Sequence, residues 1–140
     1  MSKHTGHCLC GAVRYRVKNT VSETSVCHCE MCRRWAGGPF FGTATVDGIT
    51  FFGEENITLY PSSDWAERGF CKLCGSGLFF RMVNTGHLFL ATGTLDDPSE
   101  IKMVREVFID EKPALYDFAN DCKKLTGEEL FAMYAPTDKS

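Results

Sequence analysis

Seven of the eight cysteines in this 140-residue chain lie in three short clusters, and their spacing constrains the fold more than any other feature. The clusters are Cys8-Leu9-Cys10-Gly11, Cys27-His28-Cys29-Glu30-Met31-Cys32 and Cys71-Lys72-Leu73-Cys74-Gly75. Two cysteines separated by one or two residues can direct both sulfurs at one cation, and a following glycine lets the backbone fold back over them. The spacing therefore predicts metal-binding knuckles, and Cys122 stands outside them.

The redox compartment decides whether clustered cysteines bind metal or form disulfides. No apolar stretch precedes Cys8, so we expect no secretory signal, and no apolar run approaches the roughly 18 residues of a membrane span. We therefore expect a cytoplasmic protein with no membrane partner, whose clusters hold metal ions. The net charge of −3 provides no basic excess, so nucleic acid is not an expected partner.

Zinc in a closed structural site takes four ligands, so seven clustered cysteines divide into one complete site and a remainder of three. The predicted structural ligands are Cys8, Cys10, Cys71 and Cys74. This choice would join the N-terminal strand to the middle of the predicted sheet. The predicted ligands of a second, catalytic zinc are Cys27, Cys29 and Cys32. The alternative for the first site is disulfides or unliganded cysteines.

A zinc site with three protein ligands keeps one position for water or substrate, so the triplet is the candidate reactive centre. Three thiolates on Zn²⁺ leave a charge of 2 − 3 = −1, which weakens the Lewis acidity and favours activation of a bound thiol over generation of hydroxide. The alternative is a closed structural zinc with Cys122, His7 or His28 as fourth ligand. We expect Cys122 to be a small buried hydrophobe instead.

The chain favours a single mainly β domain over residues 1–140, because short alternating runs are separated by glycine and turn residues. The expected strands are 13–17, 40–46, 49–52, 57–60, 78–82, 88–92 and 103–109. A hairpin turn is expected at 84–86. Past Pro113, the spacing of Leu115, Phe118, Ala119 and Cys122 predicts one face of a short C-terminal helix. Residues 136–140 are expected to form a frayed tail.

Beyond the spacing alone, the order of motifs resembles a known family. These motifs are Gly6, Cys8, Cys10, Gly11, Val13 and Tyr15; Cys27-His28-Cys29 and Cys32-Arg33-Arg34; Arg68, Phe70-Cys71, Cys74-Gly75-Ser76 and Leu78-Phe79; and residues 108–117. The pattern is similar to the glutathione-dependent formaldehyde-activating enzyme family, which includes the centromere protein V domain. The resemblance runs from about Gly6 to about Leu130. It departs at Glu106, where family members often have histidine.

The resemblance implies an Mss4-like zinc-binding fold of short antiparallel strands, with two zinc ions per chain divided as above. It also implies a carbon–sulfur lyase that condenses glutathione with formaldehyde to an S-hydroxymethyl adduct. The partners are then a small thiol and an aldehyde, and the oligomeric state is left open, a homo-oligomer included. Alternatives are the same fold acting on another thiol conjugate, or a non-catalytic zinc-binding interaction module.

Four residues beside the triplet are candidates for further roles. Arg33 and Arg34 follow Cys32 and could bind the carboxylates of glutathione. The alternative is that both are solvated surface charges. His28 and Glu30 are candidates for the group that protonates the product oxygen, but the sequence does not choose between them.

Overall fold

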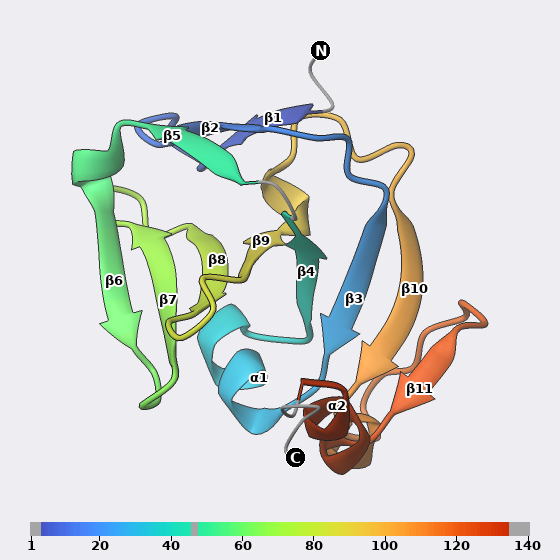
Figure 1. Cartoon of the computed structure of the whole chain (residues 1–140). Coiled ribbons are helices and arrows are strands. Elements are labelled where there is room, and N and C mark those ends of the chain that lie inside the picture. Colours follow the sequence, from blue (N-terminus) through green and yellow to red (C-terminus); the bar gives the residue numbers. More distant parts are fainter. Residues whose placement is uncertain (1–3, 46–47, 135–140) are drawn as a thin grey trace. The chain divides into compact units, whose positions relative to one another are not determined.

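The computed structural model describes residues 4–45 and 48–134, and these form a mainly β protein (Figure 1). The strands are β1 (Thr5–His7), β2 (Arg14–Val17), β3 (Glu23–Cys27), β4 (Phe40–Ala44), β5 (Ile49–Phe52), β6 (Ile57–Pro61), β7 (Ala66–Cys71), β8 (Gly77–Met82), β9 (Leu88–Ala91), β10 (Lys102–Val107) and β11 (Lys123–Leu125). The helices are α1 (Glu30–Ala36) and α2 (Gly127–Tyr134). The prediction of a mainly β fold with a short C-terminal helix is confirmed.

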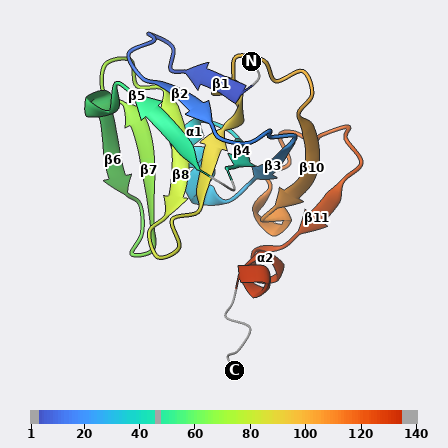
Figure 2. The same ribbon diagram turned by 45° about the horizontal axis from the view of Figure 1, so that its top comes forward.

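The chain divides into two compact units, unit 1 (residues 1–24 and 41–102) and unit 2 (25–40 and 103–140). In unit 1, β1, β2 and β5 form a three-stranded antiparallel sheet, and the strands of a second sheet follow the order β4-β9-β8-β7-β6 (Figure 2). The 84–86 turn joins β8 to β9 as predicted, with Gly86 at φ 78°. The single domain over 1–140 stays a prediction.

The core of unit 1 follows from alternation along its strands. In β2, Tyr15 and Val17 are buried whereas Arg14 and Arg16 are exposed, as the period of two requires. The core also contains two cysteines that are completely buried, Cys8 and Cys71. The first cysteine cluster is therefore continuous with the hydrophobic core.

Gly69 of β7 lies opposite Phe79 of β8, and a Cβ at this position would overlap the Phe79 ring. Phe79 is 2% exposed, so the ring has little room to move aside. We expect Gly69→Ala to lower the free energy of unfolding by about 1–3 kcal/mol, as overpacking does. Urea unfolding of the purified variant measures the change.

The matched control is Gly93→Ala in the same unit, because a Cβ at Gly93 would meet no atom within 4 Å. This variant should unfold like the parent. Equal urea midpoints for the Gly69 and Gly93 variants would contradict the packing of Phe79 on Gly69.

In unit 2, the strand order is β11-β10-β3, and β10 pairs with β11 in parallel. The register sets Glu106 opposite Lys124. Phe108 follows β10 with φ 57°, an unusual backbone conformation for an aromatic residue. Its ring packs on Phe131 of α2 at a centroid distance of 5.6 Å, and Gly127 leaves space for it. This contact connects α2 to the end of β10.

The helix predicted after Pro113 is wrong. Residues 113–122 form a turn and irregular chain, in which Tyr116 and Phe118 are half-buried while Asp117 between them is exposed. This alternation of two places both rings on the same side, and both contact His28. Leu115 is 82% exposed, so it does not belong to an apolar helix face.

The C-terminal helix starts later, at a capping box. Thr126 Oγ1 accepts from the Glu129 backbone N–H at 3.1 Å, and Glu129 Oε1 accepts from the Thr126 backbone N–H at 2.7 Å. This reciprocal pair satisfies donors that a helix start leaves without partners. The predicted tail at 136–140 lies outside the described residues.

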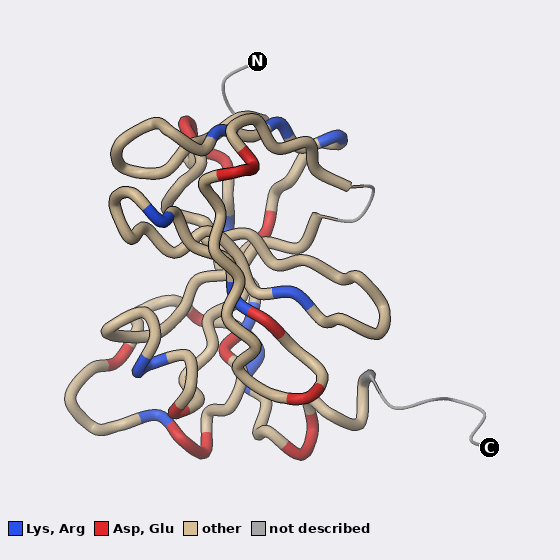
Figure 3. The backbone as a smooth tube through the Cα atoms, turned by 90° about the vertical axis from the view of Figure 1, so that its left-hand side faces the viewer, with Lys and Arg blue, Asp and Glu red and all other residues tan. Residues whose placement is uncertain are grey.

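Charged residues of both signs are distributed along the chain. Lys and Arg segments are interspersed with Asp and Glu segments along the backbone tube (Figure 3). Among the described residues, neither helix has the length and apolar character of a membrane span.

Candidate metal centres

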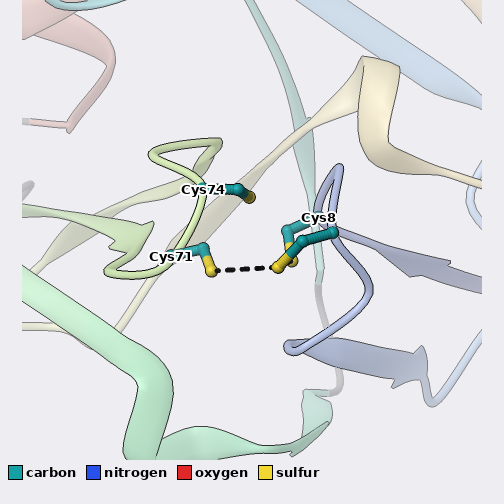
Figure 4. A group of neighbouring side chains, drawn as sticks. Cys8, Cys71 and Cys74 are labelled. Atoms are coloured by element: carbon teal, nitrogen blue, oxygen red, sulfur yellow. Dashed lines mark hydrogen bonds between the residues drawn. The ribbon is translucent and has the colours of Figure 1, made fainter.

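The first cluster gathers four sulfurs in unit 1. The Sγ atoms of Cys8, Cys10, Cys71 and Cys74 all lie within 4.8 Å of one another. Figure 4 shows Cys71 and Cys74 on one loop, with their sulfurs facing those of the loop that carries Cys8. The Sγ–Sγ distance is 3.7 Å from Cys8 to Cys10 and 3.9 Å from Cys10 to Cys71. These separations exclude disulfide bonds, which need about 2.05 Å.

The two loops have the same local structure. Gly11 and Gly75 both have φ 83°, a conformation that favours glycine. The Gly11 N–H donates to the Cys8 carbonyl at 3.1 Å, and the Gly75 N–H donates to the Cys71 carbonyl at 2.8 Å. Each loop is thus a tight turn that begins at a buried cysteine.

Backbone N–H groups point at the buried sulfurs. The Val13 N–H donates to Cys8 Sγ, and the Leu73 N–H donates to Cys71 Sγ, each at 3.4 Å. Donors of this kind stabilise thiolates, which are the form of cysteine that ligates metal.

The donor set fits zinc. Four sulfurs at about 2.3 Å from a tetrahedral zinc would lie about 3.8 Å apart, close to the two distances given above. Hydrogen bonds to the Cys74 thiol, the strongest of them from Ser76 Oγ at 3.2 Å and others from the backbone of Ser76 and Cys10, also lower its pKa to about 5. The structure thus brings together the four cysteines expected to act as structural ligands, and metal binding by them remains a prediction.

The second cluster lies in unit 2, where β3 leads into α1. Cys27 ends β3, Cys29 is the N-cap of α1, and Cys32 lies in the first turn of that helix. Their Sγ atoms lie within 4.8 Å of one another, and the Cys32 N–H donates to Cys29 Sγ at 3.4 Å. Within the described residues, this group holds three ligand atoms, whereas the first holds four.

The crowding of the triplet disfavours ionisation of Cys27. Hydrogen bonds with Cys29 and Cys32, followed by burial and repulsion between the sulfurs, raise the pKa of Cys27. A divalent cation would reverse this effect, since a coordinating thiol is deprotonated outright. The triplet therefore has the donors that a thiophilic cation such as zinc requires.

His28, between two cysteines of the triplet, is completely buried and held at four points. Its Nε2 lies 2.8 Å from Glu106 Oε1, and its Nδ1 lies 2.8 Å from the Tyr116 hydroxyl. Its backbone N–H donates to the Val107 carbonyl at 3.1 Å, and its own carbonyl accepts from Arg33 Nε at 2.9 Å. Both ring nitrogens are occupied, so His28 has no nitrogen left to ligate a metal or to protonate a product in this arrangement.

The other expected residues near the triplet have partners of their own. Arg34 Nε donates to Glu30 Oε2 at 2.8 Å, and both side chains are more than half exposed. Cys122 Sγ lies 3.9 Å from Glu106 Oε2 and is half-buried, and burial raises its pKa. In unit 1, the His7 ring contacts Asp96 and the Cys8 carbonyl.

A cavity of about 300 Å³ opens beside this network in unit 2. Its lining combines two lysines, two carboxylates and two apolar side chains: Glu106, Ile109, Lys112, Asp117, Phe118 and Lys124. Sequence reasoning did not single out either lysine. The two lysines are connected to the triplet only through contacts between residues that lie far apart in the sequence. No local sequence motif indicates such contacts.

A family model described as "Glutathione-dependent formaldehyde-activating enzyme" matches residues 3–111, well over half of the chain. The chain belongs to this family. The resemblance found in the sequence is therefore confirmed, and the matched range includes all seven clustered cysteines and Glu106.

Two relatives support the assignment of the chain to this family. An uncharacterised lyase of Schizosaccharomyces pombe is 36% identical over 131 residues, which cover 93% of this chain and 96% of the relative. A protein of Halomonas elongata, provisionally named a glutathione-dependent formaldehyde-activating enzyme, is 32% identical over 83 residues, 53% of each chain.

A solved structure supports the fold of the family member. The crystal structure of a Rhodobacter sphaeroides protein matches with a TM-score of 0.56 and 25% sequence identity. The match covers 71% of this chain and 99% of that protein.

Proposed function

We propose that this protein is a zinc-dependent carbon–sulfur lyase that condenses a thiol such as glutathione with formaldehyde or a related aldehyde. The observation that carries the proposal is the difference between the clusters, three sulfurs at Cys27, Cys29 and Cys32 against four in unit 1. A centre with three protein ligands keeps a position for a substrate atom, whereas a four-sulfur centre is closed. The family name supports the choice of thiol and aldehyde.

The proposed assignment uses two zinc ions per chain. The structural zinc would be held by Cys8, Cys10, Cys71 and Cys74, and the catalytic zinc by Cys27, Cys29 and Cys32. When bound at the triplet, zinc would supply the positive charge that keeps a substrate thiol deprotonated near neutral pH.

The reaction itself moves two electron pairs and one proton. The thiolate sulfur forms a bond to the aldehyde carbon, and the π pair of the carbonyl moves to its oxygen. That oxygen takes up a proton in place of the one that the thiol lost, so the S-hydroxymethyl product balances without a further reactant. The reverse direction breaks the carbon–sulfur bond and is the lyase reaction.

The protein's own residues would position the substrate. Arg33 and Arg34 on α1 remain the proposed partners of its carboxylates, because each donates only its Nε in the hydrogen bonds described above. A guanidinium has five N–H donors and can bind a carboxylate with two of them.

Magnetisation-exchange NMR tests the function. Formaldehyde and glutathione interconvert with the adduct without a catalyst, so the rate is compared with and without the zinc-loaded protein. We expect acceleration by the parent and a loss of at least a hundredfold in Cys29→Ser, because removal of a centre that acts only in the transition state lowers the rate by such factors.

The control is Cys122→Ser, which leaves both clusters intact and should retain the acceleration. Absence of acceleration by the parent would contradict the named reaction. It would redirect the proposal to another thiol conjugate, or to the non-catalytic interaction module.

A further inference from the structure

Two lysines line the cavity of unit 2, and they differ in how closely each one is paired with a carboxylate. Lys112 is 14% exposed, and its Nζ lies 2.7 Å from Asp117 Oδ1 and 3.1 Å from the Pro113 carbonyl. The same ammonium lies 5.3 Å from the centre of the Tyr116 ring. Lys112 is therefore a fixed part of the wall, with its charge already balanced.

Lys124 is more exposed than Lys112, and it lies farther from its carboxylate partner. Its side chain is 48% exposed, and its Nζ donates a long hydrogen bond of 3.4 Å to the Cys122 carbonyl. The nearest carboxylate oxygen, Glu106 Oε2, lies 3.8 Å away, beyond ordinary hydrogen-bond length. Glu106 also holds His28 through its other oxygen at 2.8 Å. A ligand carboxylate could thus take a hydrogen bond from Lys124 without breaking the buried contact of Glu106.

The cavity is linked to the triplet through His28. Two of its lining residues, Glu106 and Phe118, contact the ring of His28, which is bonded through the backbone to Cys27 and Cys29. Ile109 and Phe118 add apolar surface to a lining of four charged side chains, so the cavity can contact both a charged group and an apolar part of a small ligand. Its volume of about 300 Å³ suits a small molecule.

We propose that this cavity binds the carboxylate-bearing end of the thiol substrate, with Lys124 as the residue that recognises the carboxylate. The proposal rests on the proposed function and deepens it. It makes the protein selective for thiols that carry a carboxylate, such as glutathione or 3-mercaptopropionate, over neutral thiols such as 2-mercaptoethanol.

Steady-state kinetics test the selectivity. Lys124→Ala should raise KM for glutathione roughly five- to tenfold, as loss of a partly exposed charged hydrogen bond does, and leave kcat within about twofold. The KM for 2-mercaptoethanol should not change. Lys124→Arg keeps the charge and should recover most of the affinity for glutathione.

The matched control is Lys123→Ala, which removes the same charge from the neighbouring position of β11 but not from the cavity lining. Equal KM values for the Lys123 and Lys124 variants would overturn the cavity proposal and leave the proposed function standing.

Calorimetry with S-methylglutathione separates the two proposals, because this probe has both carboxylates and no free thiol. Binding that is weakened by Lys124→Ala but not by Lys123→Ala supports the cavity, even if the parent shows no condensation activity. No binding by the parent, or binding unaffected by Lys124→Ala, overturns it.

Discussion

Replacing Cys71 with serine is expected to leave the protein unfolded. Cys71 ends β7, is completely buried, and belongs to both the core of unit 1 and its four-sulfur cluster. Structural zinc contributes about 10–16 kcal/mol of apparent binding free energy in small zinc domains, whereas whole domains are stable by about 5–15 kcal/mol. Loss of a ligand to such a site therefore removes an amount comparable to the total.

Far-UV circular dichroism and zinc content check this expectation. Cys29→Ser is the informative comparison, because it alters the triplet and should yield a folded protein with one zinc per chain in place of two. Cys122→Ser should fold with both. A folded Cys71→Ser variant with full zinc content would contradict the structural role of the first cluster.

Chelation provides the same test without substitution. Titrating the parent with a strong zinc chelator should remove the metal of the triplet first, with little change in the dichroism spectrum. Removal of the second equivalent should coincide with unfolding, because the cysteine cluster of the proposed structural site is continuous with the core of unit 1.

The fold was predictable where alternation is local. The 49–52 strand has the predicted limits, and others differ by one or two residues at their described ends. The strand β7 was missed because its charged residues Glu67 and Arg68 interrupt the apolar pattern. In the structure, both charges have partners. Glu67 pairs with Arg81 on β8, and the buried Arg68 lies over the Phe80 ring at 5.0 Å.

The cysteine clusters were predictable because ligand spacing is a local signal. The surroundings of the triplet were not, because His28 and Glu106 are 78 residues apart in the sequence. The helix predicted after Pro113 was wrong for the same reason, because contacts between distant residues decide the structure there. Helical spacing of apolar residues was present, but Tyr116 and Phe118 instead pack on the His28 ring from irregular chain.

Glu106 is part of a buried pair with His28 in unit 2. Its carboxylate is 2% exposed and accepts from the completely buried His28 ring. A buried polar group without a partner is costly, and removal of one member of a buried pair costs about 3–5 kcal/mol. The pair also fixes the backbone between Cys27 and Cys29, so its loss should loosen the triplet.

We therefore expect Glu106→Ala to lower the free energy of unfolding by about 3–5 kcal/mol, whereas Glu106→Gln, which keeps an acceptor oxygen, should lose about 1–2 kcal/mol. Urea unfolding of the zinc-loaded variants measures both. Asp121→Ala removes an exposed carboxylate of the same unit and should change stability by less than about 0.5 kcal/mol.

The double variant His28→Leu/Glu106→Leu isolates the pair from its surroundings. Apolar residues in place of both partners leave no buried polar group unsatisfied, so the double variant should be more stable than Glu106→Ala. The cycle is completed by the single variants His28→Leu and Glu106→Leu, and a double variant whose loss equals the sum of theirs would instead mean that His28 and Glu106 act independently. The coupling in this cycle therefore decides whether Glu106 stabilises unit 2 through the histidine between the triplet cysteines.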